Sequence, residues 1–305
     1  MTLSSRILLS LCLTLMTFAN TDTRSWKLRD GSTIRAELVS YDQETENVIL
    51  LQNDTHELQV PFDRFSEIDK AWVIEWTEFE QVITKLNKRL GGTLDHLVVE
   101  GAYQTDLHLY YPSSYQSENA KSVPVMILFN AGAKAMRYLQ RHMEAAEQSG
   151  MLLISCGQFR NTGDNEAKEE AFLARFREVF LAIQENIVYD PESVFMGGNS
   201  GGAWRAYHYS AWVDYPWAGI YANGGWLGGQ KYFQEDYADH MRVVMVNGNN
   251  DKAANQWIEA DSKVLNQHEA EIALIAFEGG HQIPPVRSQL KAFNWLINRT
   301  EFDER

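Results

Sequence analysis

The stretch Val194–Tyr207 reads VFMGGNSGGAWRAY, and it decides how the rest of the chain is interpreted. It begins as an apolar run, passes through four glycines within six positions, and continues in a pattern typical of a helix. Glycine weakens regular structure, so its use here indicates a backbone conformation or a close approach that other residues cannot adopt. The segment therefore predicts a strand, a sharp turn around Ser200, and a helix.

The turn contains the motif G-x-S-x-G at Gly198–Gly202. A serine on a sharp turn between a buried strand and a helix projects its hydroxyl above the sheet, and its neighbours two positions away must be small. The free N–H groups at the start of the helix then face any negative charge that develops there. We predict Ser200 as a nucleophile and the N–H of Gly201 as an oxyanion donor. A glycine-rich turn without chemistry is the alternative.

A nucleophilic serine needs a base and an acid that orients the base, and in this architecture the acid comes first and the histidine last. Asp251 follows the apolar run at residues 243–247, and His281 follows the run at residues 272–277. Both are expected beyond the carboxyl ends of parallel strands, where the active sites of open sheets gather. We predict them as the partners of Ser200. A solvated turn aspartate and an ordinary loop histidine are the alternatives.

Strand and helix patterns alternate through the second half of the chain. Short apolar runs predict strands at residues 107–111, 123–130, 152–156, 194–198, 219–222, 243–247 and 272–277. Helical patterns lie at residues 134–148, 166–185, 202–212, 255–267 and 286–298. Continuous apolar strands alternating with helices predict a doubly wound, mostly parallel sheet of the α/β class.

The region from about Val123 to Ile297 resembles the α/β-hydrolase fold and is similar to secreted esterases of the feruloyl-esterase and polyhydroxybutyrate-depolymerase type. The resemblance rests on the stretches YDPESVFMGGNSGGAWRAY, MVNGNNDKAAN and FEGGHQIPP. It implies that Ser200 is the nucleophile, His281 the general base and Asp251 the residue that orients it. The chemistry it implies needs neither a metal nor another cofactor.

The chain departs from this family after the strand at residues 123–130. Family members usually carry His-Gly there, whereas this chain has Asn130 and Ala131. The N–H of Ala131 or Gly132 can still serve as an oxyanion donor, because every non-proline residue has one. Loss of one donor typically costs about 3 kcal/mol of transition-state stabilisation, so the substitution is the strongest sequence argument against full activity. Gly201, where relatives often carry a bulkier residue, is a second departure.

Residues 20–75 have a different character from the rest of the chain. Short alternating segments with turn signals about every ten residues predict a small β barrel. The stretch SWKLRDGSTIRAELVSYDQETENVILLQNDTHELQVPFDRFSEIDKAWV resembles the bacterial Sla-homology domain, an SH3-like barrel, through Trp26, the Asp30-Gly31 turn, AELV, VP and the closing FSEID. The resemblance implies a binding or scaffolding module for a protein or envelope ligand. A purely structural cap is the alternative.

The chain begins with an apolar leader. Arg6 is the one early charge, residues 7–18 are mostly apolar, and Ala19 ends a plausible cleavage site. The run is shorter than the roughly 20 residues that span a bilayer. It predicts a signal peptide at residues 1–19, a secreted or periplasmic protein, and no membrane span in the mature chain. A retained anchor, or a lipid on Cys12, is the alternative.

The chain thus divides into four predicted parts. They are a leader at residues 1–19, a small β domain at 20–75, a helical connector at 76–92 and an α/β-hydrolase domain at 93–305. The connector belongs to a helix predicted from Ala71 to about Leu90, which Gly91-Gly92 would end.

The bulk composition is that of a globular protein, with 45% hydrophobic and 22% charged residues. The net charge of −14 argues against a nucleic-acid partner. Cys12 and Cys156 are the only cysteines, so removal of the leader leaves no intrachain disulfide and the core must hold the fold. The sequence shows no H-E-x-x-H motif and no clustered Cys/His metal ligands.

The predicted site lacks a lid. The chain between residues 225 and 241 is short, where many hydrolases insert one, and an open site suits bulky or polymer-borne esters. Trp226 and Tyr232 are predicted to contact the substrate, with ordinary packing as the alternative. Export, acidity and an open site favour carbohydrate-linked or polymeric esters as substrates.

Two other functions stay open at this point. One is a serine peptidase or lactone hydrolase on the same fold. The other is a secreted binding protein with a degenerate hydrolase domain, which the substitution at Asn130 supports.

Overall fold

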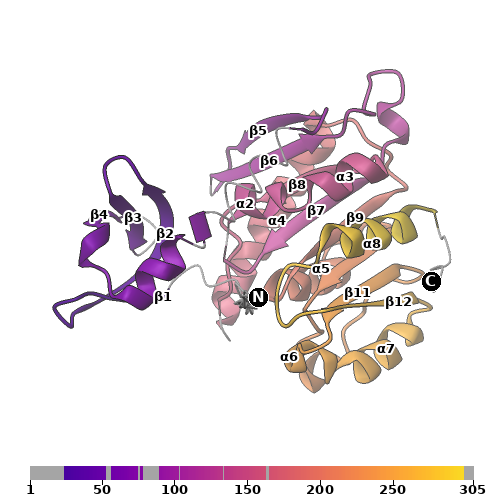
Figure 1. The fold of residues 1–305 in the computed structure, drawn as a ribbon. Coiled ribbons are helices and arrows are strands. Elements are labelled where there is room, and N and C mark those ends of the chain that lie inside the picture. The colour runs from indigo at the N-terminus through magenta and orange to yellow at the C-terminus, as the bar shows by residue number, and fades with distance from the viewer. Residues whose placement is uncertain are drawn as a thin grey trace, which may run out of the picture.

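The described residues form two β sheets, and a helical segment follows the smaller one in the chain (Figure 1). The structure is a computed structural model, and it describes residues 24–52, 56–74, 76–77, 89–102, 104–132, 134–162 and 165–298. The predicted signal peptide at residues 1–19 lies outside these ranges.

The smaller sheet is an antiparallel meander with the strand order β1-β2-β3-β4. Its strands are β1 (Arg24–Lys27), β2 (Thr33–Asp42), β3 (Asn47–Gln52) and β4 (His56–Pro61). Trp26 is fully buried, donates its indole N–H to Ala36 O at 2.8 Å, and packs edge to face against Phe65. An antiparallel bridge between Leu28 and Phe65 returns the chain to β1 after the 3-10 turn η1 (Phe62–Arg64). The sheet order is open, and closure into an SH3-like barrel stays a prediction.

A helix follows the small sheet and begins at residue 67, four residues before its predicted start. Ser66 sets this start: its Oγ accepts the N–H of Asp69 at 3.2 Å and donates to the Asp69 carboxylate at 2.9 Å. Residues 67–74 and 76–77 are helical, and residues 78–88 of the predicted connector lie outside the described ranges. The guanidinium of Arg137 lies 4.7 Å from the ring centre of Trp76, which links this helix to the larger domain.

The larger sheet has eight strands in the order β12-β11-β10-β9-β7-β8-β6-β5. They are β5 (Thr93–Val99), β6 (Thr105–Tyr111), β7 (Val125–Asn130), β8 (Leu152–Cys156), β9 (Val194–Asn199), β10 (Gly219–Asn223), β11 (Arg242–Gly248) and β12 (Glu271–Phe277). The pairs that β6 makes with β5 and β8 are antiparallel, and the others are parallel. The seven predicted strands are all present. Strand β5 was not predicted, because most of its residues at this sheet edge are exposed and form no apolar run.

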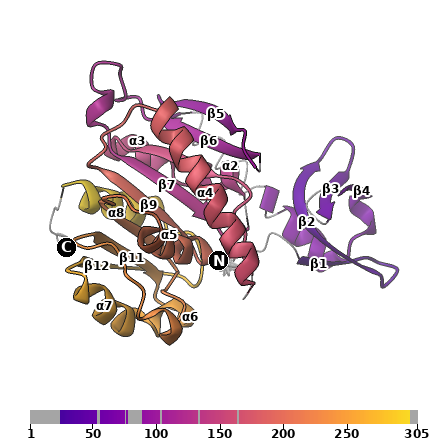
Figure 2. The same cartoon turned by 180° about the vertical axis from the view of Figure 1, so that it is seen from behind.

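Helices cover both faces of the large sheet (Figures 1 and 2). Helices α2 (Ala135–Gln140), α3 (Met143–Ser149) and α8 (Val286–Asn298) pack into one hydrophobic cluster, and α4 (Glu166–Asn186), α5 (Gly201–Trp212) and α7 (Ile258–Gln267) pack into the other. The helix predicted at residues 134–148 is two helices, because buried His142 donates to the Tyr138 carbonyl at the break. The one predicted at 255–267 is preceded by a short helix, α6 (Lys252–Asn255). None of the helices in the described ranges is long and apolar enough to cross a bilayer.

Candidate active site

Ser200 lies on the turn between β9 and α5 with φ 55° and ψ −118°. A positive φ is uncommon outside glycine and costs on the order of 1–3 kcal/mol. The N–H of Ser200 is held by Asn223 O at 2.9 Å. A Cβ on Gly198 would lie 2.5 Å from the carbonyl carbon of Gly202, and one on Gly202 would lie 2.7 Å from that of Phe129. Both glycines are therefore required by the neighbouring strand β7, and Gly198 is required by the close approach of Gly202 as well.

Asp251 and His281 contact each other beyond the ends of β11 and β12. His281 Nδ1 lies 2.8 Å from Asp251 Oδ2. The carboxylate is 2% exposed, and its Oδ1 accepts the N–H of Ala254 at 3.2 Å as the N-cap of α6. With both oxygens engaged, the carboxylate can hold the imidazole in the tautomer that leaves Nε2 available as a base. The burial of Asp251 does not fit a solvated turn residue.

The loops that carry Asp251 and His281 are tied together by their backbones. Asn249 N–H donates to Phe277 O, and Asn250 N–H donates to Gly279 O, both at 2.8 Å. A Cβ on Gly248 would lie 2.5 Å from the Gly279 carbonyl oxygen. The pair therefore depends on the absence of a side chain at the end of β11.

The backbone of Gly224-Gly225 lies close both to the Asp251–His281 pair and to the backbone of Ser200. A Cβ on Gly224 would lie 3.2 Å from His281 Cε1 and 3.1 Å from Asp251 Oδ2, and one on Gly225 would lie 2.9 Å from Ser200 O. Among the described residues, no hydrogen bond joins Ser200 Oγ to His281. The bond between a nucleophile and its base is often long before substrate binds.

Asn130, which stands where family members usually carry His, organises the loop after β7. The side chain is buried, and its Oδ1 accepts the N–H of Gly132 at 2.9 Å and that of Lys134 at 3.2 Å. Of the two donors predicted from this loop, Gly132 is therefore already engaged. The N–H groups of Ala131 and Gly201 make no hydrogen bond within the described ranges, so both could donate to an oxyanion.

A layer of asparagines beneath the site was missed by the sequence analysis. Four neighbouring strands carry one at or next to the last residue, namely Asn130, Asn199, Asn223 and Asn247. Asn199 Nδ2 donates to Asn223 Oδ1, and Asn223 Nδ2 donates to Gln282 O, both at 3.1 Å. Asn247 Oδ1 accepts the N–H of Gly224 at 3.1 Å. The layer anchors the loops that carry the site, and its signal in the sequence was an asparagine ending four apolar runs.

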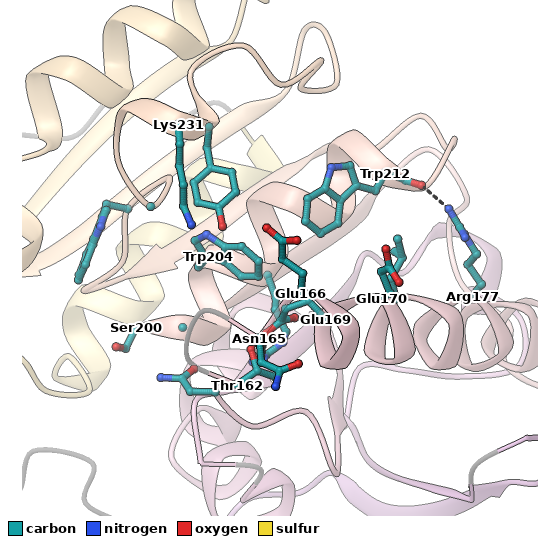
Figure 3. Close-up of a pocket in the computed structure, with 17 residues that line it drawn as sticks. Thr162, Asn165, Glu166, Glu169, Glu170, Arg177, Ser200, Trp204, Trp212 and Lys231 are labelled. Atoms are coloured by element: carbon teal, nitrogen blue, oxygen red, sulfur yellow. Dashed lines mark hydrogen bonds and ion pairs between the residues drawn. The ribbon is translucent and has the colours of Figure 1, made fainter.

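A pocket of about 830 Å³ extends from Ser200 (Figure 3). Its aromatic wall comes from α5 and from the chain after β10, with Trp204, Trp212, Trp226 and Tyr232. Its acidic wall comes from α4, with Glu166, Glu169 and Glu170. Trp226 and Tyr232, which are predicted to contact the substrate, both line this pocket. The contribution of α4 was missed because an acidic helix face resembles an ordinary solvated surface.

The loop that carries Trp226 is held by two buried titratable side chains. His208 Nε2 donates to Leu227 O at 2.8 Å, and Leu227 N–H donates to Asp261 Oδ2 at 2.9 Å. Burial lowers the pKa of His208 to about 4 and raises the pKa of Asp261 to about 6. At neutral pH the loop is therefore fixed by a neutral imidazole and an ionised carboxylate.

We expect Asp261→Asn to stabilise the protein increasingly as pH rises from about 4 to about 6. In that range Asp261 keeps its proton in the folded protein but has lost it in the unfolded chain. The free energy of unfolding of the wild type therefore falls as pH rises, whereas asparagine has no proton to lose and shows no such fall. A shift of about two pKa units corresponds to up to about 3 kcal/mol at pH 7. His208 acts in the opposite direction, because the unfolded chain binds its proton more readily over about pH 4–6.5. Because both proteins contain His208, the difference in the free energy of unfolding between variant and wild type isolates the contribution of Asp261.

Urea unfolding at several pH values would measure this difference. Asp236→Asn, at an exposed position, is the matched control and should leave the pH dependence unchanged. A stability difference between Asp261→Asn and wild type that does not vary with pH would contradict the prediction.

The site has the groups needed for acyl transfer: a hydroxyl on a strained turn, an imidazole paired with a carboxylate, and two N–H groups that have no partner among the described residues. Within the described ranges, no three His, Cys, Asp or Glu side chains are grouped so that they could hold a metal ion.

No protein-family model and no curated protein sequence matches this chain. Solved structures do match. The chain is similar to S-formylglutathione hydrolase from Staphylococcus aureus (12% identity, 68% of this chain and 98% of that chain, TM-score 0.53). It is also similar to an esterase from Pyrobaculum calidifontis (10% identity, 73% of this chain and 91% of that chain, TM-score 0.58). A third similar structure is a bacterial heroin esterase (15% identity, 72% of this chain and 89% of that chain, TM-score 0.53). Over the 68% to 73% of the chain that these matches cover, the protein has the α/β-hydrolase fold, and a small antiparallel β sheet precedes it.

Proposed function

We propose that this chain is an exported serine hydrolase that cleaves carboxylic esters through an acyl-serine intermediate. One observation carries the proposal. Ser200 lies at positive φ on a strand-to-helix turn, at the same sheet edge as an Asp251–His281 pair joined at 2.8 Å. The similarity in fold to the esterases above agrees with this reading.

In the acylation half-reaction, Ser200 Oγ attacks the ester carbonyl carbon while His281 Nε2 takes the hydroxyl proton. The carbonyl oxygen becomes an oxyanion, which the N–H groups of Gly201 and Ala131 stabilise. The tetrahedral species collapses, the bond to the alcohol oxygen breaks, and His281 gives its proton to that oxygen. Asp251 holds the imidazole and stabilises its charged form throughout.

In the deacylation half-reaction, water takes the place of the alcohol. His281 accepts a proton from the water, whose oxygen attacks the acyl carbon. Collapse breaks the bond to Ser200 Oγ, the proton returns to the serine, and the carboxylic acid leaves.

For the substrate, we propose carbohydrate-linked or polymer-borne esters. Trp212 and Trp226 line the pocket beside Ser200, and an indole ring can stack against the C–H face of a sugar ring. Exposed carboxylates of Glu166 and Glu170 can accept hydrogen bonds from sugar hydroxyls, and Lys231 can donate to them. A volume of about 830 Å³ suits a ligand larger than a short-chain ester.

We further propose that residues 20–75 form an SH3-like module of the Sla-homology type that binds a protein or envelope ligand and tethers the enzyme outside the cytoplasm. Support comes from the leader sequence and from the antiparallel sheet built around buried Trp26.

The proposed activity is tested with a fluorophosphonate probe and a substrate panel. We expect covalent labelling of one serine, in the peptide that contains Ser200, and faster hydrolysis of esters than of matched amides and lactones. Faster turnover of amides or lactones would favour a peptidase or lactone hydrolase. A folded protein without labelling or turnover would favour the binding protein with a degenerate site.

The substrate class is tested by comparing an O-acetylated oligosaccharide with p-nitrophenyl acetate, which carries the same acyl group. We expect Trp226→Ala to lower kcat/KM for the oligosaccharide about tenfold more than for the aryl ester, because it removes a stacking surface worth about 1 kcal/mol or more. Leu181→Ala, at an exposed position of α4 outside the pocket lining, is the control. Equal losses on both substrates would contradict the sugar-binding role.

A further inference from the structure

The side chain of Asn161 occupies the space directly beside Gly201. A Cβ on Gly201 would overlap Asn161 Oδ1 and would lie 2.6 Å from its Cγ and 2.9 Å from its Nδ2. The amide therefore fills the place of the missing side chain at residue 201. Gly201, whose N–H is one of the two backbone groups proposed to stabilise an oxyanion, is therefore a direct neighbour of this side chain.

The backbone of Asn161 is fixed against the other oxyanion loop. Its N–H donates to Ala131 O at 2.8 Å, and the preceding residue, Arg160, forms an antiparallel bridge with Gly132. The chain after β8 is thus paired with the chain after β7. Asn161 therefore contacts Ala131 through its backbone and Gly201 through its side chain, and the N–H groups of both residues have no partner among the described residues.

A buried arginine holds the same segment onto the helix that begins after the nucleophile. Arg205 on α5 is 1% exposed, donates Nη1–H to Phe159 O at 3.2 Å, and donates Nη2–H to Arg160 O. Its guanidinium also pairs with Glu169 at 2.8 Å. Asn161 is therefore presented by a segment that is held both by the loop after β7 and by Arg205 on α5, as preorganised electrostatic stabilisation requires.

The amide is available for substrate. Asn161 is exposed and lines the pocket together with Ser200 and Gly201. Within the described ranges its side chain makes no hydrogen bond, so a rotation that exchanges the amide oxygen and nitrogen breaks no contact. A carboxamide offers two N–H donors.

We propose that Asn161 is a catalytic residue whose Nδ2–H is a third donor to the oxyanion, beside the N–H groups of Ala131 and Gly201. The proposal rests on the proposed ester hydrolysis. It gives a physical reason for both departures from the family pattern. Asn130 engages the N–H of Gly132, so the loop after β7 has one donor fewer, and Gly201 carries no side chain because the donating amide lies there.

The test compares Asn161→Leu, which has nearly the same shape without a donor, with the wild type. We expect kcat for p-nitrophenyl acetate to fall about 100-fold with KM changed less than about threefold, because an oxyanion donor acts in the transition state. The inhibition constant of a trifluoromethyl ketone, which forms a tetrahedral oxyanion on the serine, should rise by a similar factor. Asn186→Leu, an exposed asparagine on α4 outside the pocket lining, is the control and should change neither value more than about twofold.

Asn161→Asp provides a second variant if the leucine variant is poorly folded. Its carboxylate has the shape of the amide but repels an oxyanion, so we expect a larger loss of kcat than for leucine at an unchanged melting temperature. If the wild type hydrolyses the ester and either folded variant keeps a kcat close to the wild-type value, the role of Asn161 is overturned. The proposed function would still stand in that case. Absence of wild-type labelling and turnover would overturn both.

Discussion

Replacement of Ser200 by alanine is expected to lower kcat for ester hydrolysis by at least about 10⁴-fold and to abolish fluorophosphonate labelling. Removing the hydroxyl leaves His281 without a proton to accept and the carbonyl carbon without a nucleophile, and losses of this size are typical of serine hydrolases. The residual rate comes from water activated in the same pocket. The melting temperature should stay the same or rise, because alanine removes only the hydroxyl and keeps the backbone of the turn.

Steady-state kinetics and probe labelling with mass spectrometry measure this loss. The matched control is Ser117→Ala, at an exposed position outside the pocket lining, which should behave as the wild type. Hydrolysis that persists in Ser200→Ala, with labelling on another serine, would place the chemistry elsewhere in the molecule.

Gly202→Ala is expected to have the largest effect on stability, a loss of more than about 4 kcal/mol in the free energy of unfolding. The added methyl group would overlap the Phe129 carbonyl oxygen and lie 2.7 Å from its carbonyl carbon. These are backbone atoms in the centre of a parallel sheet, so they cannot rotate away as a side chain would. Either α5 must move off β7, or the strand must lose its pairing.

Chemical denaturation followed by circular dichroism measures this effect, and failure to obtain soluble protein would agree with it. The control is Gly280→Ala, because a Cβ there meets nothing within 4 Å and its stability should change by less than about 1 kcal/mol. Normal stability of Gly202→Ala would contradict the close packing of the start of α5 against β7.

The alternation of strands and helices in the α/β domain could be predicted from the sequence. Buried parallel strands require continuous apolar runs, and the helices between them repeat their apolar residues at helical spacing, so both signals are local. The turn at Ser200 was equally local, since its glycines lie within a few residues of the serine. Asp251 and His281 could be proposed because strand ends of one sheet share an edge.

Other features depend on residues that are far apart in the chain. Nothing near Asn130 indicates that its side chain engages Gly132, and nothing near Gly201 indicates that Asn161 lies beside it. The acidic wall of the pocket was hidden for the same reason, because the α4 residues resemble a solvated surface until the helix is placed beside Trp204 and Trp212.

The sequence by itself determined the alternation of apolar strands and helices in the larger domain, the sharp turn at Ser200 and the loops that carry Asp251 and His281. The tertiary structure decided which N–H groups remain free, which asparagines anchor the loops and which helix lines the pocket. The physical reason is that strand and helix patterns are repeated within a short window, whereas hydrogen bonds between loops depend on how distant segments pack.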